Sequence, residues 1–160
     1  VFIMADVVHF FAYNELINED YFKEKGLVYL SKSSVTLSAW QRVFNKTPVD
    51  NAGVVGLGLA NIEPTNDNAG MMHGELYAMD EKLLPQLDKL FGHPDEYQRK
   101  VMRFNRHDFT MINGLTYIAH PDKIQRGLKP DKATLKIFRK AKKLFPMLYF
   151  SRLMNTPTCD

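Results

Sequence analysis

The stretch VVHFFAYNELINED, residues 7–20, decides the fold, because it leads from a buried strand into the start of a helix. Residues 7–13 are almost continuously apolar and rich in β-branched and aromatic side chains, as expected for a central strand. Asn18 has the side chain of a helix N-cap, and Gly26 is suited to ending a short helix. The stretch therefore predicts a strand, a loop and a short helix in succession.

Further strands and helices are predicted along the chain. The composition of residues 63–70 is that of a turn-forming loop. Asp80 can cap a short leucine-rich helix that Gly92 and Pro94 end. The remaining predicted elements are strands over residues 34–44, 54–61, 71–79 and 97–104, a hairpin turn at Asn113-Gly114, a helix with Asp131 as its cap and Leu135, Phe138, Ala141 and Phe145 at helical spacing, and a last helix over residues 147–154.

This order of elements predicts an α+β domain with a mostly antiparallel sheet or a small barrel. At 160 residues and 18.5 kDa the chain suits one domain, which we expect to span residues 4–160 with Met4 as the natural start. An apolar fraction of 45% and a charged fraction of 24% indicate an ordinary globular protein. No apolar run approaches membrane-spanning length, so we expect no membrane partner.

The cysteine content and the charge limit the cellular location and the kinds of partner that we expect for this protein. Cys159 is the single cysteine, so no intrachain disulfide can form, and the expected location is cytoplasmic. The net charge of +3 is small, but basic residues gather near the C-terminal end, which permits weak attraction to polyanions. The alternative is a solvated helix face, and the small net charge argues against nucleic acid as a partner. These basic residues are Lys132, Lys136, Arg139, Lys140, Lys142 and Lys143.

Motifs for cofactors and metals are missing from the sequence. Gly56-Leu57-Gly58 lacks the third glycine and the following helix of a dinucleotide-binding motif. The five histidines are scattered singly, without the spacing of metal ligands. We therefore expect no cofactor and no metal.

Several segments together resemble the γ-glutamylcyclotransferase-like proteins. FFAYNELI, residues 10–17, resembles the first strand and loop of that family, where the strand ends in Tyr-Gly-Ser. GLANIEPTNDNAGMMHGELYAM, residues 58–79, resembles its small-residue strand, turn-rich loop and Gly-x-Leu-Tyr strand. LLPQLDKLFGHPDEYQRKVMRF, residues 83–104, and KPDKATLKIFRKAKKLFPMLYFSRL, residues 129–153, are similar to its helix with a basic strand and to its C-terminal helices.

The resemblance implies a small mixed, mostly antiparallel β-barrel with inserted and C-terminal helices and a cavity. It also implies an intramolecular transfer, in which the free amine of a γ-glutamyl substrate attacks its own amide carbonyl and releases 5-oxoproline without a metal or cofactor. A carboxylate must accept the amine proton and return it to the leaving amine. Backbone N–H groups of the loop after the first strand can hold the substrate carboxylate.

The sequence departs from the family pattern at the positions that carry this chemistry. The family glutamate stands three residues after the aspartate that corresponds to Asp88, and here that position is Phe91, which cannot accept a proton. Phe91 is either core packing or an apolar wall for a different ligand. Asn14 replaces the loop glycine and tolerates a positive φ, whereas Glu15 replaces the serine and brings negative charge. Glu15 either binds an amine-bearing ligand or is a solvated surface residue.

Glu75 is the candidate replacement for the missing carboxylate. Strand alternation places Glu75 and Tyr77 on one face, and we expect Glu75 to point into the barrel, where burial would raise its pKa towards neutrality. The alternative is a solvated strand glutamate.

These observations lead to a hypothesis about function. The protein acts on a small γ-glutamyl or amino-acid-derived amide in the barrel cavity, with an altered substrate or base. The alternative is a non-catalytic module on the same fold that binds a small molecule or another subunit, including a second copy in a homodimer. The predicted catalytic residue is Glu75, and the predicted substrate-binding residues are Tyr13, Asn14, Glu15, Leu16, Ile17, Phe91, Tyr97 and Tyr117.

Overall fold

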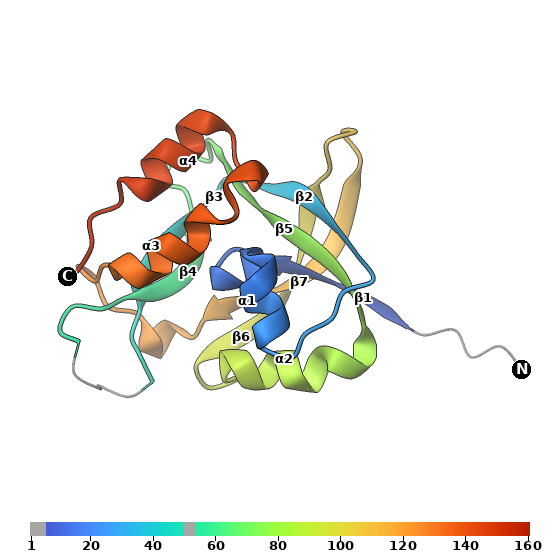
Figure 1. The fold of residues 1–160 in the computed structure, drawn as a ribbon, viewed down its shortest axis with the longest axis horizontal. Coiled ribbons are helices and arrows are strands. Elements are labelled where there is room, and N and C mark those ends of the chain that lie inside the picture. Colours follow the sequence, from blue (N-terminus) through green and yellow to red (C-terminus); the bar gives the residue numbers. More distant parts are fainter. Residues whose placement is uncertain (1–5, 50–53) are drawn as a thin grey trace, which may run out of the picture.

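Five strands close into a small barrel in the order β1-β5-β2-β6-β7 (Figure 1). The computed structural model describes residues 6–49 and 54–160, so the predicted start at Met4 lies outside the described residues. β1 pairs with β7 in parallel and the other neighbours are antiparallel, which confirms the expected α+β fold with a mixed, mostly antiparallel barrel. The barrel strands are β1 (Val7–Ala12), β2 (Ser31–Ser38), β5 (Met71–Asp80), β6 (Tyr97–Asn105) and β7 (Met111–Ala119).

The remaining elements surround this barrel (Figure 1). Two strands form a separate antiparallel pair, β3 (Trp40–Lys46) and β4 (Leu59–Pro64). The α-helices are α1 (Glu19–Glu24), α2 (Leu84–Phe91), α3 (Lys132–Arg139) and α4 (Met147–Met154), and the 3-10 turns are η1 (Glu15–Ile17), η2 (Glu81–Leu83), η3 (Pro121–Lys123) and η4 (Lys142–Leu144).

The two faces of the barrel wall follow from the register of β1 against β5. Phe11 lies opposite Leu76, and Phe10 lies opposite Tyr77, so the first pair faces one side of the sheet and the second pair the other. The Phe11 ring stacks on Phe104 with 4.5 Å between ring centroids. β1 and β6 are not neighbours in the barrel, so these two rings meet across its interior.

The outer face carries a layer of aromatic rings beneath α1 and α2. Phe22 stacks on Tyr77 with 4.0 Å between ring centroids, and Phe91 stacks on Tyr117 at 4.1 Å. Phe10 lies edge-on to both Phe91 and Tyr117. Burial of these large rings attaches both helices to the barrel.

The predicted helix caps are confirmed. The Asn18 side chain accepts hydrogen bonds from two backbone N–H groups at the start of α1. The Asp131 side chain accepts one such bond at the start of α3, with 2.9 Å between its Oδ1 and the backbone nitrogen of Thr134. Asp80 caps η2, which runs directly into α2, and Gly92 ends α2 with a φ of 59°.

Two predicted strands have different boundaries in the structure. Residues 34–44 are not one strand, because the chain turns at Ala39, where φ is 64°, and β3 leaves the barrel to pair with β4. The strand predicted over residues 54–61 begins only at Leu59, after Gly56 turns the chain with a φ of 81°. Both boundaries are set by backbone turns that interrupt apolar runs.

Asn113 and Gly114 lie inside β7, so the hairpin turn predicted at this pair is wrong. The turn between β6 and β7 lies at residues 106–110, where Asp108 accepts a hydrogen bond from a backbone N–H two residues further on. A Cβ added at Gly114 would lie 3.1 Å from the carbonyl oxygen of His9. Close packing of the strand explains this glycine.

The C-terminal segment lies beside the β3-β4 pair (Figure 1). Phe138 of α3 packs against Phe44 of β3 with 6.1 Å between ring centroids. α3 ends at Arg139, so Ala141 and Phe145 lie beyond the helix that was predicted to include them, and the predicted last helix is confirmed as α4. Across the described residues, the structure contains no helix long and apolar enough to cross a membrane.

We expect Gly74→Ala to destabilise the fold more than Gly114→Ala. A Cβ at Gly74 would lie 2.5 Å from the Phe11 ring and 2.6 Å from the carbonyl oxygen of Ala12, both closer than any contact at Gly114. Overpacking of this kind costs about 1–3 kcal/mol in the free energy of unfolding, which urea denaturation measures. Wild-type stability in Gly74→Ala would contradict a tightly packed barrel interior.

Candidate functional site

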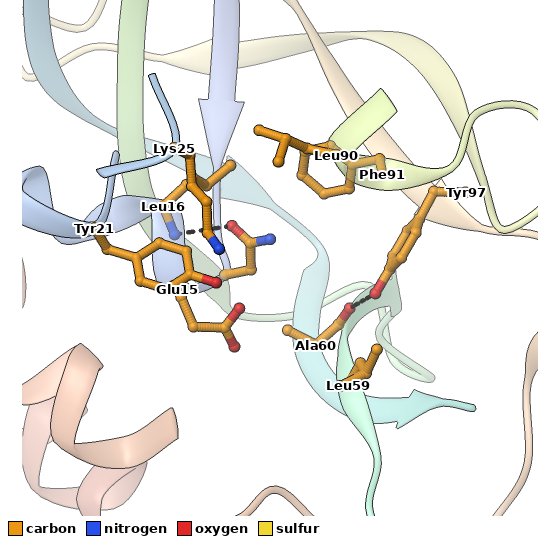
Figure 2. Close-up of a pocket in the computed structure, with 10 residues that line it drawn as sticks. Glu15, Leu16, Tyr21, Lys25, Leu59, Ala60, Leu90, Phe91 and Tyr97 are labelled. Carbon is orange, nitrogen blue, oxygen red and sulfur yellow. Dashed lines mark hydrogen bonds between the residues drawn. The ribbon is translucent and has the colours of Figure 1, made fainter. Parts of the chain in front are cut away.

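A cavity of about 180 Å³ lies between the loop after β1 and the end of α2, with β4 and β6 completing its wall (Figure 2). Phe91 of the outer aromatic layer lines this cavity. The cavity therefore lies beside the barrel, whereas the sequence predicted it inside the barrel. Its lining residues are Asn14, Glu15, Leu16, Tyr21, Lys25, Leu59, Ala60, Leu90, Phe91 and Tyr97.

The loop after β1 uses its backbone N–H groups internally. The Asn14 Oδ1 accepts a hydrogen bond from the Leu16 N–H at 3.1 Å, and the Asn14 carbonyl accepts one from Ile17 at 3.0 Å. Asn14 itself is extended, with a φ of −98°, so the positive φ considered for this position is not adopted. Because these donors already have partners, they are not free to hold a ligand carboxylate.

Side chains from the barrel fix the loop at both ends. The Tyr13 hydroxyl donates to the Tyr117 carbonyl at 2.5 Å, and the Tyr77 hydroxyl donates to the Leu16 carbonyl at 2.7 Å. Tyr13 was predicted to line the cavity, but it is 1% exposed and does not line this one, so the structure places it in the support of the loop.

Arg42 on β3 is the third anchor of this loop. Its Nε donates to the Tyr13 carbonyl at 2.6 Å, and its Nη2 donates to the His73 carbonyl at 2.8 Å. Its Nη1 donates to the Tyr149 hydroxyl of α4 at 2.9 Å. The guanidinium therefore joins β1, β5 and α4.

Glu15 presents its carboxylate to the cavity from η1, with Tyr21 beside it (Figure 2). Burial raises the pKa of Glu15, its own backbone N–H and Lys25 lower it, and the negative charge of Asp131 raises it further. Lys25 lies over the Tyr21 ring, with its Nζ 4.9 Å from the ring centroid. Among the described residues, no side chain donates a hydrogen bond to the Glu15 carboxylate.

Phe91 and Tyr97 form the opposite wall of the cavity (Figure 2). Their rings meet edge to face, with 5.3 Å between centroids, and the Tyr97 hydroxyl donates to the Ala60 carbonyl at 2.7 Å. Tyr117 lies behind Phe91 and donates a hydrogen bond to Asp88, so it supports the wall without lining it. Phe91 is thus both core packing and an apolar wall.

Glu75 lies outside this cavity. It shares the outer face with Tyr77, as expected from alternation, but that face points away from the barrel interior, so the predicted inward orientation is wrong. Glu75 and Ile17 both line a separate groove beneath residues 140–144. A catalytic role for Glu75 stays a prediction, and the structure does not bring Glu75 together with Phe91.

The cavity therefore brings together Asn14, Glu15, Leu16, Phe91 and Tyr97 from the predicted set. The residues missed from sequence are Tyr21, Lys25, Leu59, Ala60 and Leu90 in the lining and Arg42 behind the loop. Tyr21 and Lys25 belong to the predicted helix that follows the loop. Their closeness to Glu15 in the sequence was the signal that could have identified them as lining residues. In the described ranges, His, Cys, Asp and Glu side chains form no group of three that could hold a metal ion.

Comparison with known proteins gives a family and a fold. The sequence matches the family described as gamma-glutamyl cyclotransferase, AIG2-like, over residues 11–136. No curated protein matches the sequence significantly.

Solved structures share the fold at low sequence identity. A gamma-glutamyl cyclotransferase is 16% identical with a TM-score of 0.81, covering 96% of this chain and 89% of that chain. An uncharacterized human protein is 16% identical with a TM-score of 0.79, covering 95% and 89%. A yeast gamma-glutamyl cyclotransferase specific to glutathione is 12% identical with a TM-score of 0.61, covering 92% and 94%. The chain belongs to the AIG2-like gamma-glutamyl cyclotransferase family.

Proposed function

We propose that the cavity binds the amine end of a small γ-glutamyl or amino-acid-derived amide, and that Glu15 takes the proton-accepting role that Phe91 cannot fill. One observation carries this proposal: a partly buried carboxylate without a side-chain partner faces the cavity from the loop that contacts substrate in the resembling family.

The charges and rings around the cavity favour an amine over a carboxylate. Glu15 supplies a negative charge, and the rings of Tyr21, Phe91 and Tyr97 supply faces and edges that can surround an ammonium group. The loop N–H groups that would bind an anion are already hydrogen-bonded to Asn14. A ligand carboxylate in this position would meet Glu15 instead of free donors.

The proposed reaction is the cyclisation typical of the family. Glu15 accepts a proton from the ammonium group of the γ-glutamyl ligand, and the freed amine nitrogen forms a bond to the γ-amide carbonyl carbon. The original amide C–N bond then breaks as the leaving nitrogen takes this proton back from Glu15. Glu15 next passes the second proton of the attacking nitrogen to the released amine, which departs as an ammonium ion, so the ring nitrogen keeps one hydrogen. The products are 5-oxoproline and a free amine, with no net loss or gain of electrons.

A non-catalytic binding module is the second candidate. It is favoured by the stacking of Phe91 on Tyr117, which closes the wall where the family glutamate stands. In this case Glu15 holds the ligand amine as a salt-bridge partner and no bond breaks. Release of 5-oxoproline distinguishes the two candidates.

We expect γ-glutamyl amides to bind the wild-type protein and Glu15→Gln to weaken this binding by tenfold or more, because a charge-assisted hydrogen bond contributes about 1.5–3 kcal/mol. A panel of γ-glutamyl amides, measured by calorimetry and by thermal shift, tests this expectation. N-acetylated forms of the same compounds lack the ammonium group and should not bind. Glu81→Gln, on the exposed surface, is the matched control.

The same panel reports on chemistry through 5-oxoproline release. Release by wild type and its loss in Glu15→Gln support the acid-base role, whereas binding without release supports the non-catalytic candidate. Equal affinity of wild type and Glu15→Gln for every ligand would contradict both.

We also expect the stability difference between wild type and Glu15→Gln to depend on pH. The pKa of Glu15 is raised by burial, so its contribution to stability is fully present below the ordinary glutamate pKa of about 4.3 and is lost as pH rises through the folded pKa. Glu15→Gln should therefore be more stable than wild type at pH 8, and this advantage should shrink towards pH 4. Urea denaturation across this range measures it, and a difference independent of pH would argue against a buried Glu15 charge.

A further inference from the structure

A groove of about 790 Å³ lies on the other side of the loop from the Glu15 cavity. Ile17 of the loop, residues 32–34 of β2, Glu75 of β5 and residues 140–144 form its walls, together with Glu19. η4 lies against β5, so the C-terminal segment covers the outer face of this strand (Figure 1). This volume is within the usual range of small-molecule pockets, roughly 300–1,000 Å³.

Glu75 is a largely buried residue whose carboxylate faces this groove without a partner among the described residues. The residue is 8% exposed, and no described residue donates a hydrogen bond to its carboxylate or lies within salt-bridge distance. Burial raises its pKa, while the positive charge of Lys32 opposes the shift. No buried side-chain oxygen of the described residues lacks a partner, so the Glu75 carboxylate oxygens reach the groove, where a bound cationic group can pair with them.

Glu19 lines the same groove, but its carboxylate, unlike that of Glu75, has partners. Its carboxylate accepts a hydrogen bond from the Tyr29 hydroxyl at 2.5 Å and forms salt bridges with Lys23 and Lys32, each at 3.2 Å. These partners lower the pKa of Glu19 to about 2. Lys32 is therefore engaged by Glu19, and Glu75 remains the acceptor that faces the groove.

The rim of the groove is basic. Lys140, Lys142 and Lys143 line it, are exposed, and form no salt bridge with any carboxylate in the described part of the chain. A ligand in the groove thus meets a negative group at the base and three positive groups at the edge.

We propose that this groove is a second binding site, independent of the Glu15 cavity, for a small zwitterion of the acidic dipeptide class. The ligand ammonium pairs with Glu75, Ser34 lies opposite Glu75 on β2 and offers a hydroxyl group on the same face, and the ligand carboxylates lie against Lys140, Lys142 and Lys143. A simple polyanion would place negative charge against Glu75. A polyamine would be repelled by the three lysines. The charge pattern therefore selects a ligand that carries both a positive and a negative charge.

The dipeptide Glu-Glu, which carries one ammonium group and three carboxylates, tests this proposal. We expect it to shift the amide NMR signals of residues 33–34 and 140–144, and its affinity from calorimetry to fall tenfold or more in Glu75→Gln. A Lys142→Ser/Lys143→Ser double variant changes exposed side chains only and should weaken binding in the same direction. Glu15→Gln should leave it unchanged, which separates this site from the proposed function.

The N-acetylated dipeptide lacks the ammonium group and should bind at least tenfold more weakly. Equal affinity for the acetylated peptide, unchanged affinity in Glu75→Gln, or no binding of the free dipeptide at millimolar concentration would each overturn the proposal. Loss of binding in Glu15→Gln would place the peptide in the other cavity and would also overturn it. Glu75→Gln keeps the side-chain shape and breaks no hydrogen bond or salt bridge of the described residues, so we expect this variant to fold.

Discussion

The Arg42 guanidinium is the constraint on which the site depends. Its three hydrogen bonds hold the Tyr13 carbonyl at the start of the loop, the His73 carbonyl on β5 and the Tyr149 hydroxyl on α4. The rings of Phe138 and Phe145 each lie 5.7 Å from the guanidinium carbon and add cation-π contacts. The small sheet, the barrel and the C-terminal helices thus fix one loop conformation, so Glu15 is positioned before any ligand arrives.

The aromatic layer determines the chemical character of one wall of the cavity. Phe91 stacks on Tyr117 and contacts Phe10 and Tyr97 edge-on, so a carboxylate at this position would be surrounded by rings. The layer stabilises α2 against the barrel, but it leaves that wall of the cavity without a proton acceptor. A carboxylate on the facing loop, at Glu15, restores one charge of the same sign to the cavity. Under the proposed function, this change of wall distinguishes the chain from the family pattern.

Local signals in the sequence were sufficient for most of the fold. The caps at Asn18, Asp80 and Asp131 and the stop at Gly92 depend on residues within a few positions, and the structure confirms them. The failures share long-range causes. Gly114 mimics a turn residue but serves close packing, and Arg42 acts on Tyr13, 29 positions away, and on Tyr149, 107 positions away. Glu75 points outward because its face of the sheet becomes the outside of the closed barrel. Strand alternation alone does not specify which face becomes the outside.

The pKa of the Glu15 side chain, followed by ¹³C NMR with and without a γ-glutamyl amide, tests the central claim most directly. Because burial and a cationic ligand act in opposite directions on a carboxylate, the account predicts a pKa above the ordinary value in the free protein and a fall when the amine binds. An ordinary pKa near about 4.3 that the ligand leaves unchanged would show that Glu15 neither lies buried in the cavity nor meets the ligand amine, and would contradict the account.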